Sequence, residues 1–245
     1  MGKDNAQLQQ MMDETAEGKL LGPQIVPSGF LEGESPYSAN NGFLIKDLPG
    51  AKKAIDWYAE HGYPQLKIYN SFPKAILRDT IAYAHSRGMR VSGHIPVGLR
   101  AFEAIDAGYD EIQHINQVML NFLATPSTET RTLERFILPA EKTAELDFNS
   151  PAVKNFIATL KAKKISIDPT LSAFTFLKQR DGDVNEVFAP IADHMPPDVK
   201  RGFSVGSMKI PDEASLKRYE KSYAKMVQFV GILDKAGGPL GAGVG

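Results

Sequence analysis

Apolar residues recur along the chain with two spacings, which predict helices and strands in alternation. Stretches with apolar residues three or four positions apart predict helices, because this spacing places them on one helix face. Short runs rich in β-branched residues between these stretches predict strands. The predicted helices cover residues 5–17, 47–62, 73–88, 99–108, 151–160 and 216–233. The predicted strands cover residues 24–28, 65–69, 90–95, 110–115, 165–170 and a short last segment that reaches Gly245.

The helix predicted over residues 47–62 has the clearest ends. Asp47 suits the N-cap position, because its carboxylate can accept a hydrogen bond from a free backbone N–H, and Pro49 suits the first turn. Gly62 is a typical helix terminator. The predicted buried stripe of this helix consists of Ala51, Ala54, Ile55, Tyr58 and Ala59.

Three segments lack either periodicity. Residues 29–42 are rich in Gly, Ser and Asn and are predicted to form a loop. Two further segments, at about 120–147 and 178–210, are interpreted as insertions. We therefore predict that residues 1–245 form a single, incomplete domain that carries two insertions.

The alternation of strands and helices predicts an α/β fold, with parallel strands and helices outside the sheet. Two architectures have this pattern, a (β/α) barrel and a doubly wound open sheet. Six strands are too few to close an eight-stranded barrel. We therefore predict a partial (β/α) TIM-type barrel, which either lacks part of the barrel or is completed by another chain.

Composition excludes several classes of function. The 245 residues include 28 Lys and Arg and 29 Asp and Glu, so no basic excess exists to neutralise a nucleic-acid backbone. The absence of cysteine excludes disulfides, thiolate metal sites and cysteine nucleophiles. No apolar run approaches the roughly 18 residues of a membrane span, and the polar N-terminal segment is unlike a signal peptide. Neither a nucleic acid nor a membrane is therefore expected as a partner.

A lysine in the strand predicted over residues 65–69 is the first candidate for chemistry. Strand alternation places Leu66 and Ile68 on one face and Lys67 and Tyr69 on the other. If the apolar pair faces the helices, Lys67 points to the inner face of the sheet. Burying an unpaired ammonium there is costly, so the lysine needs a lowered pKa, a partner or a covalent change.

Histidines end the next two predicted strands. His94 and His114 follow Lys67 in chain order, and the carboxyl ends of successive strands in a parallel barrel meet at one mouth. Each residue alone fits an ordinary structural role, such as a hydrogen-bonded core histidine or a solvated lysine at a sheet edge. The three together, at matched positions, favour a metal site with neutral imidazole ligands.

The motifs LKIYNS, VSGHIP and DEIQHIN, taken in this order, resemble the metal-dependent amidohydrolase superfamily, with the imidazolonepropionase-like and prolidase-like branch as the nearest match. The resemblance extends over nearly the whole chain. It implies a carboxylated Lys67 and a divalent metal, zinc, bound by this residue, His94 and His114. It also implies that Tyr69 contacts a small amide or peptide-like substrate and that the activity is hydrolysis of C–N bonds.

The chain also departs from the family pattern. The family has a His-x-His pair on its first strand and an aspartate, the general base, at the end of its eighth strand. The five histidines here include no such pair, and Gly245 stands at or just before the position of the aspartate. The resemblance therefore implies a fragment that lacks the first barrel strands and the end of the last, holds at most one metal ion and is catalytically impaired.

Three other interpretations remain open from the sequence. The chain could be a non-catalytic barrel fragment that self-associates, because missing strands leave open sheet edges; either way, we expect a homo-oligomer. Lys67 could instead form a Schiff base in an aldolase-like barrel. Asp168 could be a metal ligand, although its position before Pro169 favours a turn or capping residue.

Overall fold

The computed structural model describes residues 6–243. These residues form two compact units. The first unit comprises the residues up to Leu99 together with Glu103–Glu111, and the second comprises Arg100–Phe102 and the residues from Ile112 onward. Each unit is described separately below.

A four-stranded parallel sheet forms the centre of the first unit. Its order is β2-β1-β3-β4, so β1 and β3 are the inner strands. The strands are β1 (Ser28–Gly33), β2 (Phe43–Ile45), β3 (Gln65–Ile68) and β4 (Arg90–Gly93). All three pairings are parallel, and Lys67 pairs with Phe30 on one side and with Ser92 on the other.

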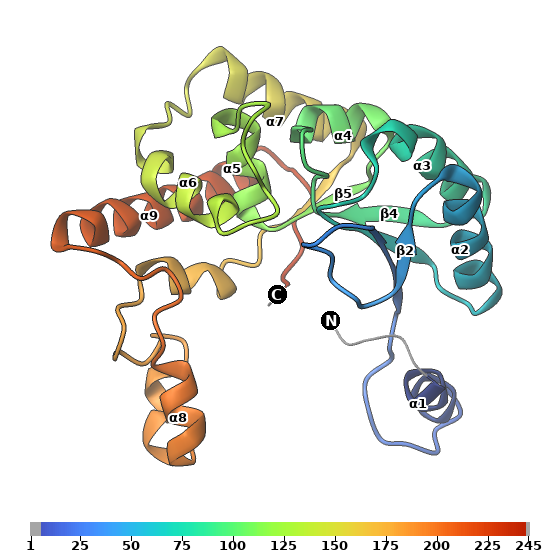
Figure 1. Cartoon of the computed structure of the whole chain (residues 1–245), viewed down its shortest axis with the longest axis horizontal. Helices are drawn as coiled ribbons and strands as arrows, with labels where there is room; N and C mark the ends of the chain where they lie inside the picture. The colour runs from blue at the N-terminus through green and yellow to red at the C-terminus, as the bar shows by residue number, and fades with distance from the viewer. Residues whose placement is uncertain (1–5, 244–245) are drawn as a thin grey trace. The chain divides into compact units, whose positions relative to one another are not determined.

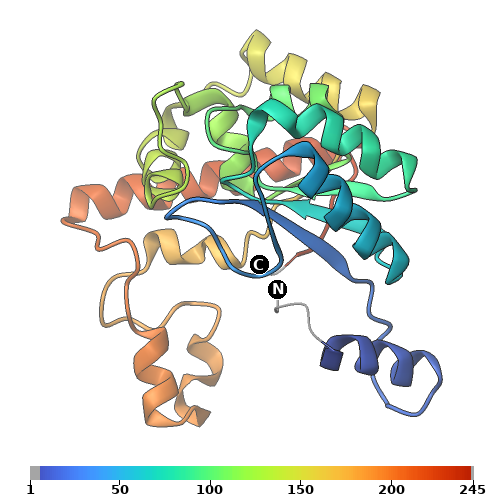
Figure 2. The same cartoon turned by 45° about the vertical axis from the view of Figure 1, so that its right-hand side comes forward.

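Helices cover one face of this sheet (Figure 1). Helix α2 packs on β1, β2 and α3, and α3 packs on β4. The turned view of Figure 2 shows α2 and α3 on the same side of the strands. As predicted, the Asp47 carboxylate accepts a hydrogen bond from the N–H of Gly50, at 2.8 Å. The helices of this unit are α1 (Ala6–Ala16), α2 (Leu48–Glu60), η1 (Lys74–Ile76), α3 (Leu77–Ser86) and the larger part of α4 (Ala101–Ala107).

The second unit is mostly helical. Its strands, β5 (Glu111–Gln113, of which Glu111 belongs to the first unit) and β6 (Ser166–Asp168), pair with each other, and Ile167 forms a parallel bridge with Leu240. Phenylalanine rings from α5, α7 and α9 meet edge to face in its core; Phe156, for example, lies 5.4 Å from Phe122. The helices are α5 (Ile115–Leu123), α6 (Glu134–Lys142), η2 (Thr143–Glu145), α7 (Pro151–Lys163), η3 (Ala173–Lys178), η4 (Ala189–His194), α8 (Pro197–Phe203) and α9 (Glu213–Lys235).

The prediction was wrong for the first strand and the loop after it. The strand begins at Ser28, where it was expected to end, and extends to Gly33, into the segment predicted as a loop. Its two glycines mark close packing rather than flexibility. A Cβ atom at Gly29 would lie 2.6 Å from the Tyr58 ring, and one at Gly33 would overlap the Ser71 carbonyl group. Strand β2 begins at Phe43, directly after this segment, and was not predicted.

Helical structure also occupies the two predicted insertions. Helices α6 and η2 lie within residues 120–147, and α5 begins just before this segment and ends inside it. Helices η4 and α8 lie within residues 178–210. Both views show α8 projecting from the rest of its unit on an extended loop (Figures 1 and 2). The predicted last strand is reduced to the bridge at Leu240, and its end, residues 244–245, lies outside the described residues.

The parallel strands and the many helices confirm the predicted α/β class. Closure into part of a barrel, and the single domain, stay predictions. No helix within residues 6–243 combines the length and the apolar character that a membrane crossing requires.

Candidate metal centre

The predicted strand alternation around Lys67 is present in the first unit. Lys67 is buried, with 5% of its surface exposed. Gly29 faces Tyr58 of α2, so every second residue of β1, counted from Gly29, faces the helices. Phe30, the next residue, points to the other face of the sheet. Lys67 pairs with Phe30 and therefore points to that face as well. Leu66 and Ile68, on the helix side, are fully buried.

A second row of side chains lies one step further along the same face. It consists of Glu32, Tyr69 and His94, which stand two residues after Phe30, Lys67 and Ser92. Glu32 lies within β1, whereas Tyr69 and His94 directly follow β3 and β4. Ring contacts connect Tyr69 to both rows. Its ring lies 5.0 Å from that of Phe30, in the first row, and 4.0 Å from that of His94, in the second. Lys67 Nζ lies 5.8 Å from the centre of the Tyr69 ring.

Glu32 is a buried acidic residue that sequence reasoning missed. It is fully buried, and its carboxylate accepts hydrogen bonds from the backbone N–H groups of Gly33, Ser71 and Ala39, at 3.0, 2.7 and 3.4 Å. It therefore ties the loop after β1 to the turn after β3. The sequence signal for a buried acid here was the position of Glu32 directly after the apolar pair Phe30 and Leu31. The glycines on either side indicated a loop instead.

His94 is fixed through its backbone and its ring. Its N–H donates to the carbonyl oxygen of Ile68 at 3.0 Å, and its own carbonyl accepts from the hydroxyl of Tyr109 at 2.7 Å. Burial raises the pKa of Tyr109 well above its usual value, so this hydroxyl stays a donor. Nδ1 of the ring lies 2.8 Å from Oδ1 of Asn70. His94 thus has a defined ring orientation at the carboxyl end of β4.

His114 lies in the second unit, directly after β5, and has an unusual backbone. Its φ is 74°, and that of Thr170, two residues beyond the end of β6, is 46°. Such values cost about 1–3 kcal/mol for residues other than glycine and are concentrated at functional sites. The two residues are linked, since Nδ1 of His114 lies 2.7 Å from Oγ1 of Thr170.

Asp168 holds this strained pair in place. Its carbonyl accepts from the N–H of His114 at 2.7 Å. Its carboxylate accepts from the N–H groups of Thr170 and Gly243, at 3.2 and 2.9 Å. The interpretation of Asp168 as a turn or capping residue is therefore confirmed.

The structure brings Lys67, Tyr69 and His94 together on one sheet face in the first unit and places His114 in the second unit. Within residues 6–243, no three His, Asp or Glu side chains form a ready metal-binding group. The predicted ligands include only two residues of these types, because the third donor is a lysine. Within the first unit, the His94 imidazole, held through Nδ1, and a carboxylated Lys67 would be donors of the kinds that a divalent metal binds.

Comparison with known proteins gives a fold but no sequence family. No family model matches the sequence, and no curated protein is significantly similar to it. Solved structures do match. The bottromycin amidohydrolase AH aligns with 95% of this chain at 16% identity and a TM-score of 0.64. A Xaa-Pro dipeptidase with bound methionine aligns with 99% at 14% identity and a TM-score of 0.54. The A. niger ochratoxinase aligns with 96% at 13% identity and a TM-score of 0.54.

The matched part is about half of each solved structure: 48% of the bottromycin amidohydrolase, 53% of the dipeptidase and 49% of the ochratoxinase. The chain thus spans about half the length of the structures that it resembles. At these identities the likeness establishes the fold alone. The fold is therefore shared with about half of each of these structures, whose names include an amidohydrolase and a Xaa-Pro dipeptidase, in agreement with the resemblance of the three motifs.

Proposed function

We propose that this chain carries part of the active site of a metal-dependent hydrolase that acts on amide or other C–N bonds. Lys67, His94 and His114 would hold one divalent ion, zinc, and Tyr69 would contact the substrate. The observation that carries the proposal is the burial of Lys67 on the sheet face that also presents His94. A lysine that is buried at such a position has a chemical reason to be there, either a polar partner or a covalent change.

Carboxylation supplies such a reason. The lysine ammonium first gives a proton to the buffer, and the neutral Nζ amine then attacks the carbon of CO₂. An N–C bond forms, one C–O π bond breaks with its electron pair going to oxygen, and the nitrogen gives a second proton to the buffer, so the cation is replaced by an anionic oxygen ligand. Glu32 already places a buried carboxylate on the same face. Two anionic groups on one buried face need a counter-charge, which a divalent cation provides.

The bound ion would polarise the substrate carbonyl and lower the pKa of a water molecule. The residues of this chain would perform the positioning. Tyr109 and Asn70 fix His94, and Asp168 with Thr170 fixes His114. The names of the structural neighbours, which include a Xaa-Pro dipeptidase and an amidohydrolase, support a small amide or peptide-like substrate.

We further propose that the two units form a partial (β/α) TIM-type barrel in which the three ligands converge. The chain spans about half of the solved structures that it matches. Its histidines include no His-x-His pair, and the aspartate that serves as general base in the resembled family is not found in the 245 residues. We therefore expect the chain alone to hydrolyse its substrate slowly.

Hydrolysis by the purified chain tests this function. The chain, loaded with zinc in bicarbonate buffer, is assayed on a panel of Xaa-Pro dipeptides and N-acyl amino acids, with Lys67→Ala as the test variant. His194→Ala is the matched control, because His194 is an exposed histidine of η4. We expect slow hydrolysis that chelation and Lys67→Ala abolish and His194→Ala leaves unchanged. Hydrolysis that survives chelation or the loss of Lys67 would contradict the proposal, as would failure of the wild-type chain to retain zinc.

A further inference from the structure

The ring of His94 is oriented by an amide side chain from the neighbouring strand end. Asn70 lies two residues after β3 and is buried, with 3% of its surface exposed. Its Oδ1 atom lies 2.8 Å from Nδ1 of His94. Asn70 is held in turn, because its carbonyl oxygen accepts from the N–H of Val97 at 2.8 Å. The next residue, Ser71, donates its N–H to the Glu32 carboxylate at 2.7 Å.

We propose that Asn70 is a positioning residue that selects the tautomer of His94, and that Glu32 holds the turn carrying Asn70 in place. This inference rests on the proposed function for its purpose, which is to present Nε2 of His94 to the metal. It assigns a role to two residues, Asn70 and Glu32, that neither the motif resemblance nor strand alternation singled out.

The chemistry of the contact decides the tautomer. An amide oxygen can only accept a hydrogen bond, so Nδ1 of His94 must carry the proton that it donates to Asn70. In the neutral imidazole the lone pair then lies on Nε2, the atom left to coordinate a metal. Because this tautomer is selected before the metal arrives, metal binding requires no change of the His94 tautomer.

The contact of His114 with Thr170 offers a contrast. A threonine hydroxyl can either donate or accept, so the 2.7 Å contact to Nδ1 is compatible with both tautomers. The structure therefore predicts different behaviour for the two histidines in the metal-free protein. His94 is held in the Nδ1–H form, whereas this contact alone imposes no such choice on His114.

Nitrogen NMR of the full chain labelled with ¹⁵N-histidine tests the inference. Spectra of the metal-free protein are recorded at a pH where the imidazoles are neutral, for the wild type, Asn70→Ala and Asn70→Asp. We expect the Nδ1–H form of His94 in the wild type and in Asn70→Asp, which keeps an acceptor oxygen. A mixture of tautomers is expected in Asn70→Ala. The control variant is Asn149→Ala, because Asn149 is exposed and lies in the second unit.

Zinc affinity, measured by competition with a chromophoric chelator, gives the second readout. Loss of a group that orients a metal ligand typically weakens metal binding about 10- to 100-fold, which is the expected effect of Asn70→Ala. An Nε2–H tautomer in the wild type would overturn the inference, as would an unchanged tautomer in Asn70→Ala. If the wild type binds no zinc, the proposed function fails, but the tautomer comparison still decides the role of Asn70.

Discussion

At the scale of single residues, the identity of the buried polar side chains decides what this sheet can do. Lys67 could be placed from the sequence, because the alternation of a strand is a local property and its apolar neighbours fix the face. Glu32 could not, because the glycines around it indicate a loop until the packing against Tyr58 and Ser71 is known. Asn70 gave no signal either, since its role comes from a contact with a residue 24 positions away.

The hydroxyl of Tyr109 provides a test at this scale. Tyr109→Phe removes the donor to the buried His94 carbonyl and leaves that oxygen without its hydrogen bond. We expect a loss of about 1–2 kcal/mol in the free energy of unfolding, measured by urea denaturation. Tyr223→Phe is the matched control, because its hydroxyl donates to the Leu171 carbonyl from a half-buried position at 3.2 Å and should matter less. Equal losses in the two variants would argue against a special role for Tyr109.

At the scale of elements, the sequence predicted helices with clear ends and an exposed polar face, and missed two helices whose residues give conflicting signals. Helix α2 has a clear stripe and an N-cap, so its position was predictable. Helix α5 is buried on nearly all sides, including the polar residues Asn116, Gln117 and Asn121, so its polar positions do not mark a solvent-exposed face. Helix α6 contains Pro139 in its interior, which ordinarily indicates a break.

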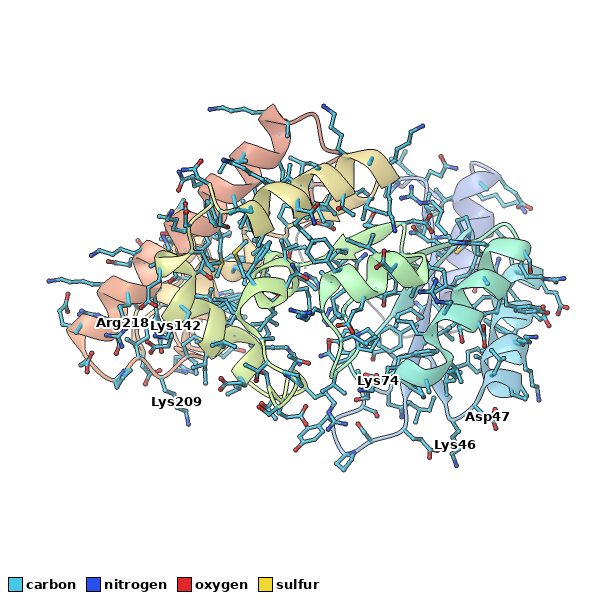
Figure 3. All side chains as sticks on the ribbon, turned by 90° about the horizontal axis from the view of Figure 1, so that it is seen from above. Lys46, Asp47, Lys74, Lys142, Lys209 and Arg218 are labelled. Carbon is cyan, nitrogen blue, oxygen red and sulfur yellow. The ribbon has the colours of Figure 1, made fainter. Side chains whose placement is uncertain are left out.

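A charged cluster connects α6 to α9, and it gives a pH-dependent prediction. The Glu141 carboxylate accepts from Arg218 Nε and from the hydroxyl of Tyr219, at 2.8 and 2.9 Å. Figure 3 labels Arg218 on α9 and Lys142, the residue that follows Glu141 in α6. The hydrogen bonds from Arg218 and Tyr219 lower the pKa of Glu141, although its partial burial opposes them. Burial first, and then Glu141, raises the pKa of Tyr219 to about 12, so its hydroxyl remains a donor.

A lowered pKa means that the folded state stabilises the ionised form of Glu141 relative to the unfolded chain. Its contribution is present above the pKa of the unfolded chain and is lost as the pH falls through the lower pKa of the folded state. We expect Glu141→Gln to cost about 0.5–1 kcal/mol at pH 7, a modest value because the pair is partly exposed. This difference should shrink in acid. Urea denaturation of the wild type and Glu141→Gln, at pH 7 and at an acidic pH, measures this difference in the free energy of unfolding. A cost that grows as the pH falls would contradict the stabilising role of the ionised Glu141.

At the scale of the whole molecule, the proposed metal site depends on convergence of residues from both units. Chain order and strand-end positions could predict Lys67, His94 and His114 as a set, because parallel α/β folds bring the carboxyl ends of their strands to one edge. The sequence could not predict the division into two units, since it arises from long-range contacts. The convergence of His114 with the other two ligands stays a prediction.

Self-association is a second prediction at this scale. Strand β2 is an edge of the four-stranded sheet of the first unit, and Leu44 on it is 42% exposed. Edge strands with apolar side chains favour pairing with another chain. We expect sedimentation to show a dimer that dissociates on dilution and is weakened by Leu44→Lys. Leu133→Lys, at another exposed leucine in the second unit, should leave it unchanged. A monomer at all concentrations would exclude self-association.

Elemental analysis of the purified chain tests the central claim most directly. Wild type, Lys67→Ala, His94→Ala, His114→Ala and the control His194→Ala are loaded with zinc in bicarbonate buffer and dialysed. The proposed ligands predict one zinc per chain in the wild type and the control, and less than about one tenth of that in the three ligand variants. Zinc that remains in Lys67→Ala at the wild-type level, or a wild-type chain that retains none, would contradict the account.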